Sequence, residues 1–112
     1  MKNALPLPEN KKLSVTYRIE PGCLGPEGGS HVVAFCDFAQ EAFQSVNASY
    51  IHWIIVPRDD KSLPEMSYSA IGKRMNHSQA DKYLALFDQS LDAFEMNLGI
   101  KMAAVINQYM GH

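Results

Sequence analysis

Residues 12–20, KLSVTYRIE, decide the fold of this chain. Leucine, valine, tyrosine and isoleucine alternate there with serine, threonine and arginine, and many of these residues are β-branched or aromatic. Such alternation is typical of a β-strand that buries one face. Pro21 and Gly22 follow at once, so we predict that the strand ends before them.

A glycine-rich segment, PGCLGPEGGSH over residues 21–31, leads from this strand into an amphipathic helix. Ser30 is a favoured helix N-cap, and we expect the helix to begin there. Apolar residues then recur at spacings of three and four, at Val32, Phe35, Cys36, Ala39, Phe43 and Val46. The pattern predicts a helix of about four turns with this stripe against the core.

The segment YIHWIIVP, residues 50–57, predicts a second strand that is apolar on both faces. Two apolar faces are typical of a strand in the middle of a covered sheet. Because a strand, a helix and a strand form a right-handed crossover, we expect the two strands to be parallel. Residues 66–75, MSYSAIGKRM, give a weaker third strand, antiparallel to the second, whose serines and Gly72 leave its existence open.

The last third of the chain is predicted to be helical. Apolar side chains repeat at spacings of three, four, three and four, at Leu84, Phe87, Leu91, Phe94 and Leu98. After Gly99 the stripe resumes one residue out of phase. Glycine costs roughly 1 kcal/mol in a helix interior relative to alanine, so either one long helix is kinked at Gly99 or two helices meet there.

These elements predict a single α+β domain over residues 1–112. It has a small mixed three-stranded sheet, in the order strand, helix, strand, strand, with one long kinked or two C-terminal helices. Residues 1–10 contain two prolines and little periodicity, and we expect an irregular lead-in that packs through Leu5 and Leu7. One short helix covers too little of such a sheet, so the C-terminal helix or a second copy of the chain must cover the rest.

Composition narrows the function classes. The 112 residues are 46% hydrophobic and 20% charged, with a formal net charge of −2. No positive field favours nucleic acid, and no apolar run is long enough for a signal peptide or a membrane span. We therefore expect a cytoplasmic protein that binds neither nucleic acid nor membrane, and whose two cysteines are free thiols.

The glycine-rich loop and the end of the second strand form one candidate ligand site. Backbone N–H groups that lead into a helix N-terminus favour anions, and parallel strands bring their carboxyl ends together. The candidate residues are Gly28, Gly29, Ser30, His31 and Arg58. The loop matches neither G-x-x-x-x-G-K-[ST] nor G-x-G-x-x-G, so a small anion fits better than a nucleotide.

Thiol and metal chemistry are weaker hypotheses. Cys23, in the mobile loop before the helix, is the candidate reactive thiol, with His31 or His52 as its base and Asp59 or Asp60 to orient the ring. Cys23, His31, Cys36 and His52 are also zinc-type ligands, but their spacing suits no structural zinc site. We expect no metal and no cofactor.

Two functions remain. The first is association, as a homodimer or with a protein partner, through burial of Leu84, Phe87, Leu91 and Phe94 or of the second sheet face. The alternative is a small-molecule or anion-binding protein, or an enzyme, that uses loop 22–31 and Arg58. The sequence leaves open whether the protein is an enzyme.

Overall fold

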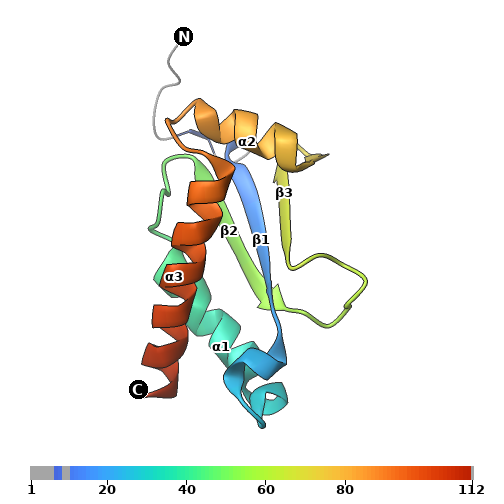
Figure 1. Ribbon diagram of the computed structural model, residues 1–112, viewed down its shortest axis with the longest axis vertical. Helices are drawn as coiled ribbons and strands as arrows, with labels where there is room; N and C mark the ends of the chain where they lie inside the picture. Colours follow the sequence, from blue (N-terminus) through green and yellow to red (C-terminus); the bar gives the residue numbers. More distant parts are fainter. Residues whose placement is uncertain (1–6, 9–10, 112) are drawn as a thin grey trace.

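The computed structural model of the chain describes residues 7–8 and 11–111, with the backbone alone for Cys23. The chain forms an α+β fold, as predicted, with a mixed sheet and a long C-terminal helix (Figure 1). In chain order the elements are β1 (Leu13–Ile19), the short 3₁₀ helix η2 (Pro21–Leu24), α1 (Gly28–Phe43), β2 (Ile51–Pro57), β3 (Met66–Ala70), β4 (Lys73–Met75), α2 (His77–Ala85) and α3 (Leu91–Met110).

The sheet has four strands in the order β2-β1-β3-β4, and β1 is central. β1 and β2 are parallel, as the crossover predicts, and Val15 lies opposite Trp53. The prediction that residues 50–57 form the central strand is wrong: β2 lies at an edge, because β3 pairs antiparallel with β1 on its other side. Arg18 fixes this arrangement: its N–H donates to Glu65 O at 2.8 Å and its Nη1 to Pro64 O at 2.8 Å, which holds the connecting loop against β1.

The single strand predicted over residues 66–75 is a hairpin of two strands, which is why the sheet has four strands and not three. The chain reverses at Ile71 and Gly72, whose φ angles are 53° and 71°. Positive φ at both central residues defines a type I′ turn, whose twist matches that of paired strands. The Gly72 that weakened the strand prediction is therefore the turn itself.

A side chain of α1 explains how the apolar strand β2 stays at an edge. Gln40 Nε2 donates to Trp53 O at 2.8 Å, and Ile55 N donates to Gln40 Oε1 at 2.9 Å. The amide thus satisfies two outward-facing backbone groups that an edge strand otherwise leaves open. Pairing of another strand at this point of β2 is blocked.

The core lies between one face of the sheet and the helices. Along β1 and β2, buried residues such as Val15 and Trp53 alternate with half-buried residues and with the exposed His52. α1 and α3 pack on this face and on each other, with the Phe35 and Tyr109 rings edge to face at 5.3 Å. The opposite sheet face carries no helix packed against it among the described residues, and presents Ser14, Thr16, Arg18, His52, Ile54, Val56, Ser67 and Ser69.

Two helices form the C-terminal third, but they do not meet at Gly99. Gly99 lies exposed inside α3, and the break falls between Ala85 and Leu91. Asp88 has a φ of 61°, and the Ser90 side chain caps α3 by accepting a hydrogen bond from Ala93 N at 3.2 Å. The break therefore follows from local capping chemistry that the apolar repeat hides, because the stripe continues in phase across it.

β1 ends before Pro21, as predicted, but the start of α1 differs from the prediction. α1 begins at Gly28, two residues before the predicted cap Ser30, whose hydroxyl donates to Glu27 O at 2.9 Å. Most of the predicted lead-in, including Leu5, lies outside the described residues. Leu7 packs against the core, and its N–H donates to Ser49 O at 2.8 Å.

Candidate functional site

The carboxyl ends of β1 and β2 lie side by side, as the parallel pairing predicts. Ile19 is the partner of Pro57 in the ladder, and Arg58 N donates to Ile19 O at 2.9 Å. Arg58 thereby follows β2 next to Glu20, the residue that follows β1. The predicted meeting of the two strand ends is present, and its chemistry depends on what Arg58 contacts.

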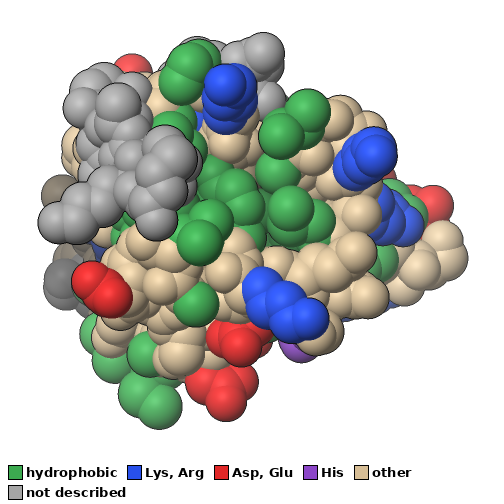
Figure 2. Space-filling view, turned by 90° about the horizontal axis from the view of Figure 1, so that it is seen from above, with side chains coloured by type: hydrophobic (Ala, Val, Ile, Leu, Met, Phe, Trp, Pro, Cys, Tyr) green, Lys and Arg blue, Asp and Glu red, His purple; other side chains and the backbone are tan. Residues whose placement is uncertain are grey.

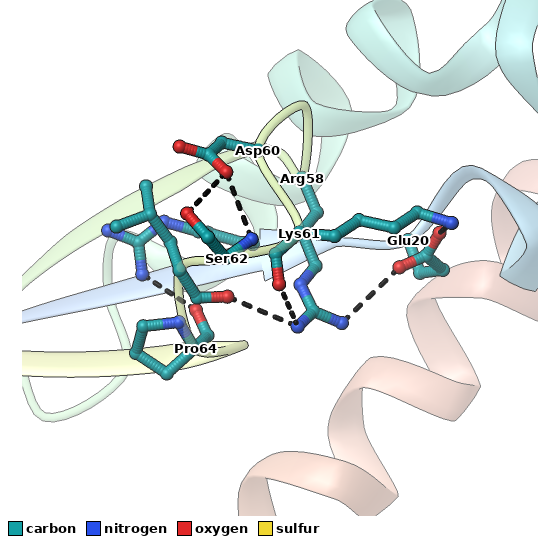
Figure 3. Close-up of polar contacts among 8 residues, drawn as sticks. Glu20, Arg58, Asp60, Lys61, Ser62 and Pro64 are labelled. Atoms are coloured by element: carbon teal, nitrogen blue, oxygen red, sulfur yellow. Dashed lines mark hydrogen bonds and ion pairs between the residues drawn. The ribbon is translucent and has the colours of Figure 1, made fainter.

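The guanidinium of Arg58 binds acceptor groups of its own chain (Figure 3). Its Nη1 lies 3.4 Å from Glu20 Oε2, and its Nη2 donates to Leu63 O at 3.1 Å and to Lys61 O at 3.4 Å. Lys61 Nζ also approaches Glu20, at 3.2 Å from Oε1. Arg58 Nε is buried without a hydrogen-bond partner among the described residues. Glu20 therefore takes the place beside the guanidinium that an anion would occupy, and Arg58 braces the turn after β2.

The glycine-rich loop uses several of its N–H groups internally. Gly25 N donates to Gly22 O at 3.3 Å, Gly28 N to Gly25 O at 3.0 Å, and Ser30 N to Glu27 O at 3.0 Å. Gly29, Ser30 and His31 are exposed at the start of α1. Among the described residues, the hydrogen-bond and ion-pair partners of the Arg58 side chain are Glu20, Lys61 and Leu63, none of which lies in residues 28–31. The two halves of the predicted anion site are thus neighbours without a shared contact.

The described residues show no arrangement that supports the thiol or the metal hypothesis. The side chain of Cys23 lies outside the described part of the chain. Cys36 is a buried free thiol, and its burial, with Asp37 and Asp59 nearby, raises its pKa from 9.0 to about 11. A thiol with so high a pKa is a poor nucleophile at neutral pH. Across residues 7–8 and 11–111, no three His, Cys, Asp or Glu side chains gather closely enough to hold a metal ion.

Three of the four predicted interface residues belong to the core of the single chain. Leu84, Leu91 and Phe94 are 0%, 4% and 4% exposed. Phe87 is half-buried, and its ring stacks on Tyr50 with centroids 4.2 Å apart. At the end of the molecule that carries α2, hydrophobic side chains remain visible between Lys and Arg side chains (Figure 2). The sequence stripe thus describes how α2 and α3 fold onto their own sheet.

The side of α3 that points away from the core is a surface that the sequence reasoning missed. Residues turn by about 100° along a helix, so six exposed positions lie opposite the buried stripe. They are Ala93, Met96, Ile100, Ala103, Ala104 and Asn107, here named the outer face of α3. Met96 is 68% and Ile100 65% exposed, and the face contains no charged residue.

An uncharged solvent-facing side is unusual, because surface helices ordinarily carry charged residues opposite the core. Of the three charged residues of α3, Glu95 and Lys101 lie to the sides of this face, and Asp92 is exposed in the first turn, ahead of it. The sequence does indicate this face, because the 20 residues of α3 include only three charged ones. The apolar stripe on the core side of the helix is the stronger of the two patterns.

The open sheet face has a different character. Ser14, Thr16, Ser67 and Ser69 place hydroxyl groups at its centre, and Arg18 Nη1 donates to Ser67 Oγ at 2.7 Å. Ile54 and Val56 are its half-buried apolar residues. This face is therefore polar and carries positive charge, whereas the outer face of α3 is apolar and uncharged.

Comparisons with protein-family models, with curated proteins and with solved structures find no match for this chain. Within the described residues, no helix is long and apolar enough to cross a membrane.

Proposed function

We propose that the protein acts by association, as a homodimer formed through the outer face of α3. The observation that supports this is the absence of charge from the six exposed positions of this face, from Ala93 to Asn107, with Met96 and Ile100 near its centre. Burial of these side chains removes apolar surface from water without desolvating an ion. We further propose a cytoplasmic location, in which Cys36 stays a thiol.

A second copy of the chain suits this face better than a charged partner. A two-fold interface places each residue against its own symmetry mate or against a fixed counterpart. If two α3 helices cross antiparallel at Ile100, position 96 faces position 104, so that Met96 meets the small Ala104. No like charges oppose each other in this arrangement, and the face runs for about 21 Å along the helix.

The other surfaces are less suited to self-association. Pairing two copies through the open sheet face brings Arg18 and its symmetry mate into one interface, where like charges repel. Leu84, Leu91 and Phe94 are already covered within the chain. The alternative function, anion binding by loop 22–31 and Arg58, is not favoured, because Glu20 already neutralises that guanidinium.

The test compares two lysine substitutions of matched exposure. Ile100→Lys places a charge at the centre of the proposed interface, while Val33→Lys does the same on α1, where Val33 is also 65% exposed. Light scattering at tens of micromolar is expected to give a dimer for the unchanged protein and for Val33→Lys. Ile100→Lys is expected to weaken association at least tenfold, about 1.4 kcal/mol, because two desolvated lysines face each other. A monomeric unchanged protein, or a dimer unaffected by Ile100→Lys, overturns the proposal.

A further inference from the structure

A cleft of about 160 Å³ opens between the end of α1, the edge strand β2 and the flank of α3. Its floor consists of the buried side chains of Phe43, Trp53, Phe94 and Leu98. Its rim consists of Val46, Asn47, Gln89, Asn97 and Lys101. Arg58, Cys36 and the residues that begin α1 are not among the described residues that line this cleft.

The floor is aromatic and fixed in place. The Trp53 and Phe94 rings are nearly parallel, at 12° with centroids 5.8 Å apart, and the Phe43 ring meets Trp53 edge to face at 5.1 Å. Trp53 Nε1 donates to Val46 O at 2.8 Å, which satisfies the indole N–H and holds the ring. The floor therefore offers ring faces and edges to a ligand, and the indole N–H of Trp53 is already hydrogen-bonded within the chain.

The rim is polar and positive. Lys101 Nζ lies 5.5 Å from the centroid of the Phe43 ring, and no ion pair joins it to a carboxylate within the described residues. Within the same residues, the side-chain amides of Asn47, Gln89 and Asn97 make no hydrogen bond to another group. None of the described residues that line the cleft is Asp or Glu. Its walls thus present one cation and three amides above an apolar floor, and no negative charge.

We propose that this cleft binds a small aromatic carboxylate with a single ring. The ring lies on Trp53 and Leu98, and the carboxylate accepts from Lys101 Nζ and from a rim amide such as that of Asn97. The size agrees, because an apolar cavity of about 150 Å³ holds one benzene molecule. The chemistry agrees as well, since binding sites combine an apolar body with a few convergent polar groups, and charge-assisted hydrogen bonds supply orientation.

Trp53 is the only tryptophan in the chain, so its fluorescence reports directly on the floor of the cleft. The probes are benzoate, benzyl alcohol and cyclohexanecarboxylate, which separate the ring from the charge. Benzoate is expected to change Trp53 emission saturably, and each of the other two to bind at least tenfold more weakly. No saturable change up to about 10 mM benzoate, or an equal response to all three probes, overturns the proposal.

Matched lysine variants test the role of the cation. Lys101→Met keeps the apolar stem and is expected to weaken benzoate binding about tenfold while leaving benzyl alcohol binding unchanged. Lys73→Met, on β4 at the far edge of the sheet, is expected to bind benzoate as the unchanged protein does. Benzoate binding that is unaffected by Lys101→Met overturns the assignment. The same titration on Ile100→Lys separates this proposal from dimerisation, because the cleft lies within one chain.

Discussion

Gly28 is the residue at which the fold leaves the least freedom. A Cβ added there would lie 1.7 Å from Pro21 O and 2.7 Å from Pro21 C, both backbone atoms of η2. η2 and the first turn of α1 pack so closely that only a hydrogen fits between them. The glycine-rich loop is therefore explained in part by close packing and needs no ligand to account for Gly28.

We predict that Gly28→Ala destabilises the protein by at least about 2 kcal/mol, because η2 or the start of α1 must move to admit the methyl group. The matched control is Gly29→Ala, one residue later in the same turn, where nothing lies within 4 Å of the added Cβ. That variant is expected to be neutral or slightly stabilising, since alanine favours a helix over glycine. Urea unfolding of the two variants measures the difference, and equal stabilities would contradict the packing argument.

Arg58 shows how far sequence reasoning reaches for a single residue. The parallel crossover correctly placed it at the shared end of two strands, beside the residues that follow β1. The sequence pattern does not predict its ion pair with Glu20, because Glu20 appears there only as the last residue of a strand. Whether a guanidinium meets a ligand or a carboxylate of its own chain depends on side-chain geometry within a few ångströms, which no periodicity records.

Among the elements, the β3–β4 hairpin carries the clearest local strain. Ile71 is exposed at the tip with a φ of 53°, in the left-handed region that β-branched residues rarely adopt. Gly72 follows with a φ of 71°, which glycine adopts without cost. Asn-Gly is the preferred pair for such a turn, so the element has kept a residue that its backbone disfavours.

We expect Ile71→Asn to stabilise the protein by about 1 kcal/mol, because asparagine tolerates the left-handed conformation. Gly72→Ala is the complementary variant and is expected to destabilise by a similar amount, since it introduces a Cβ at positive φ. Thermal or urea unfolding gives both signs. Loss of stability in Ile71→Asn would show that the isoleucine side chain makes a stabilising contact.

Element identity was the part of the structure that the sequence predicted best. The alternation in residues 12–20 and the spacing in residues 32–46 arise within one segment, so they survive without knowledge of the rest. The predicted strand order is wrong because the order depends on hydrogen bonds of Arg18 and Gln40, which join segments far apart in the chain. The predicted position of the helix break is wrong because the apolar spacing continues unchanged past Ser90, so the cap there leaves no trace in the pattern.

Two buried side chains that can lose a proton, Tyr68 and Cys36, make the stability of the whole molecule depend on pH. The buried Tyr68 donates a hydrogen bond to Glu95 Oε2 at 2.5 Å, and burial, together with this carboxylate, raises the pKa of Tyr68 above its ordinary value. Burial likewise raises the pKa of Cys36 from 9.0 to about 11. Each group keeps its proton in the folded state over a pH range in which the unfolded chain has lost it.

We therefore predict that these two groups leave the free energy of unfolding unchanged up to about pH 9 and lower it as the pH rises further. Cys36 alone contributes a loss of roughly 2 kcal/mol between pH 9 and pH 11, and Tyr68 adds to the slope above pH 10. Urea unfolding across this range measures it. Cys36→Ala is expected to lower the slope between pH 9 and pH 10, and an unchanged slope would show that other groups titrate there.

The sequence by itself determined the α+β class, the parallel pairing of residues 13–19 with residues 51–57, and the amphipathic character of α1. Those features follow from side-chain periods and from the handedness of a short crossover, which are local. Only the tertiary structure decided that β1 is central, that one sheet face stays open, that Glu20 neutralises Arg58, and that α3 turns an uncharged face outward. Each of these depends on which distant segments come into contact, because burial and charge pairing are properties of the packed chain and not of any one segment.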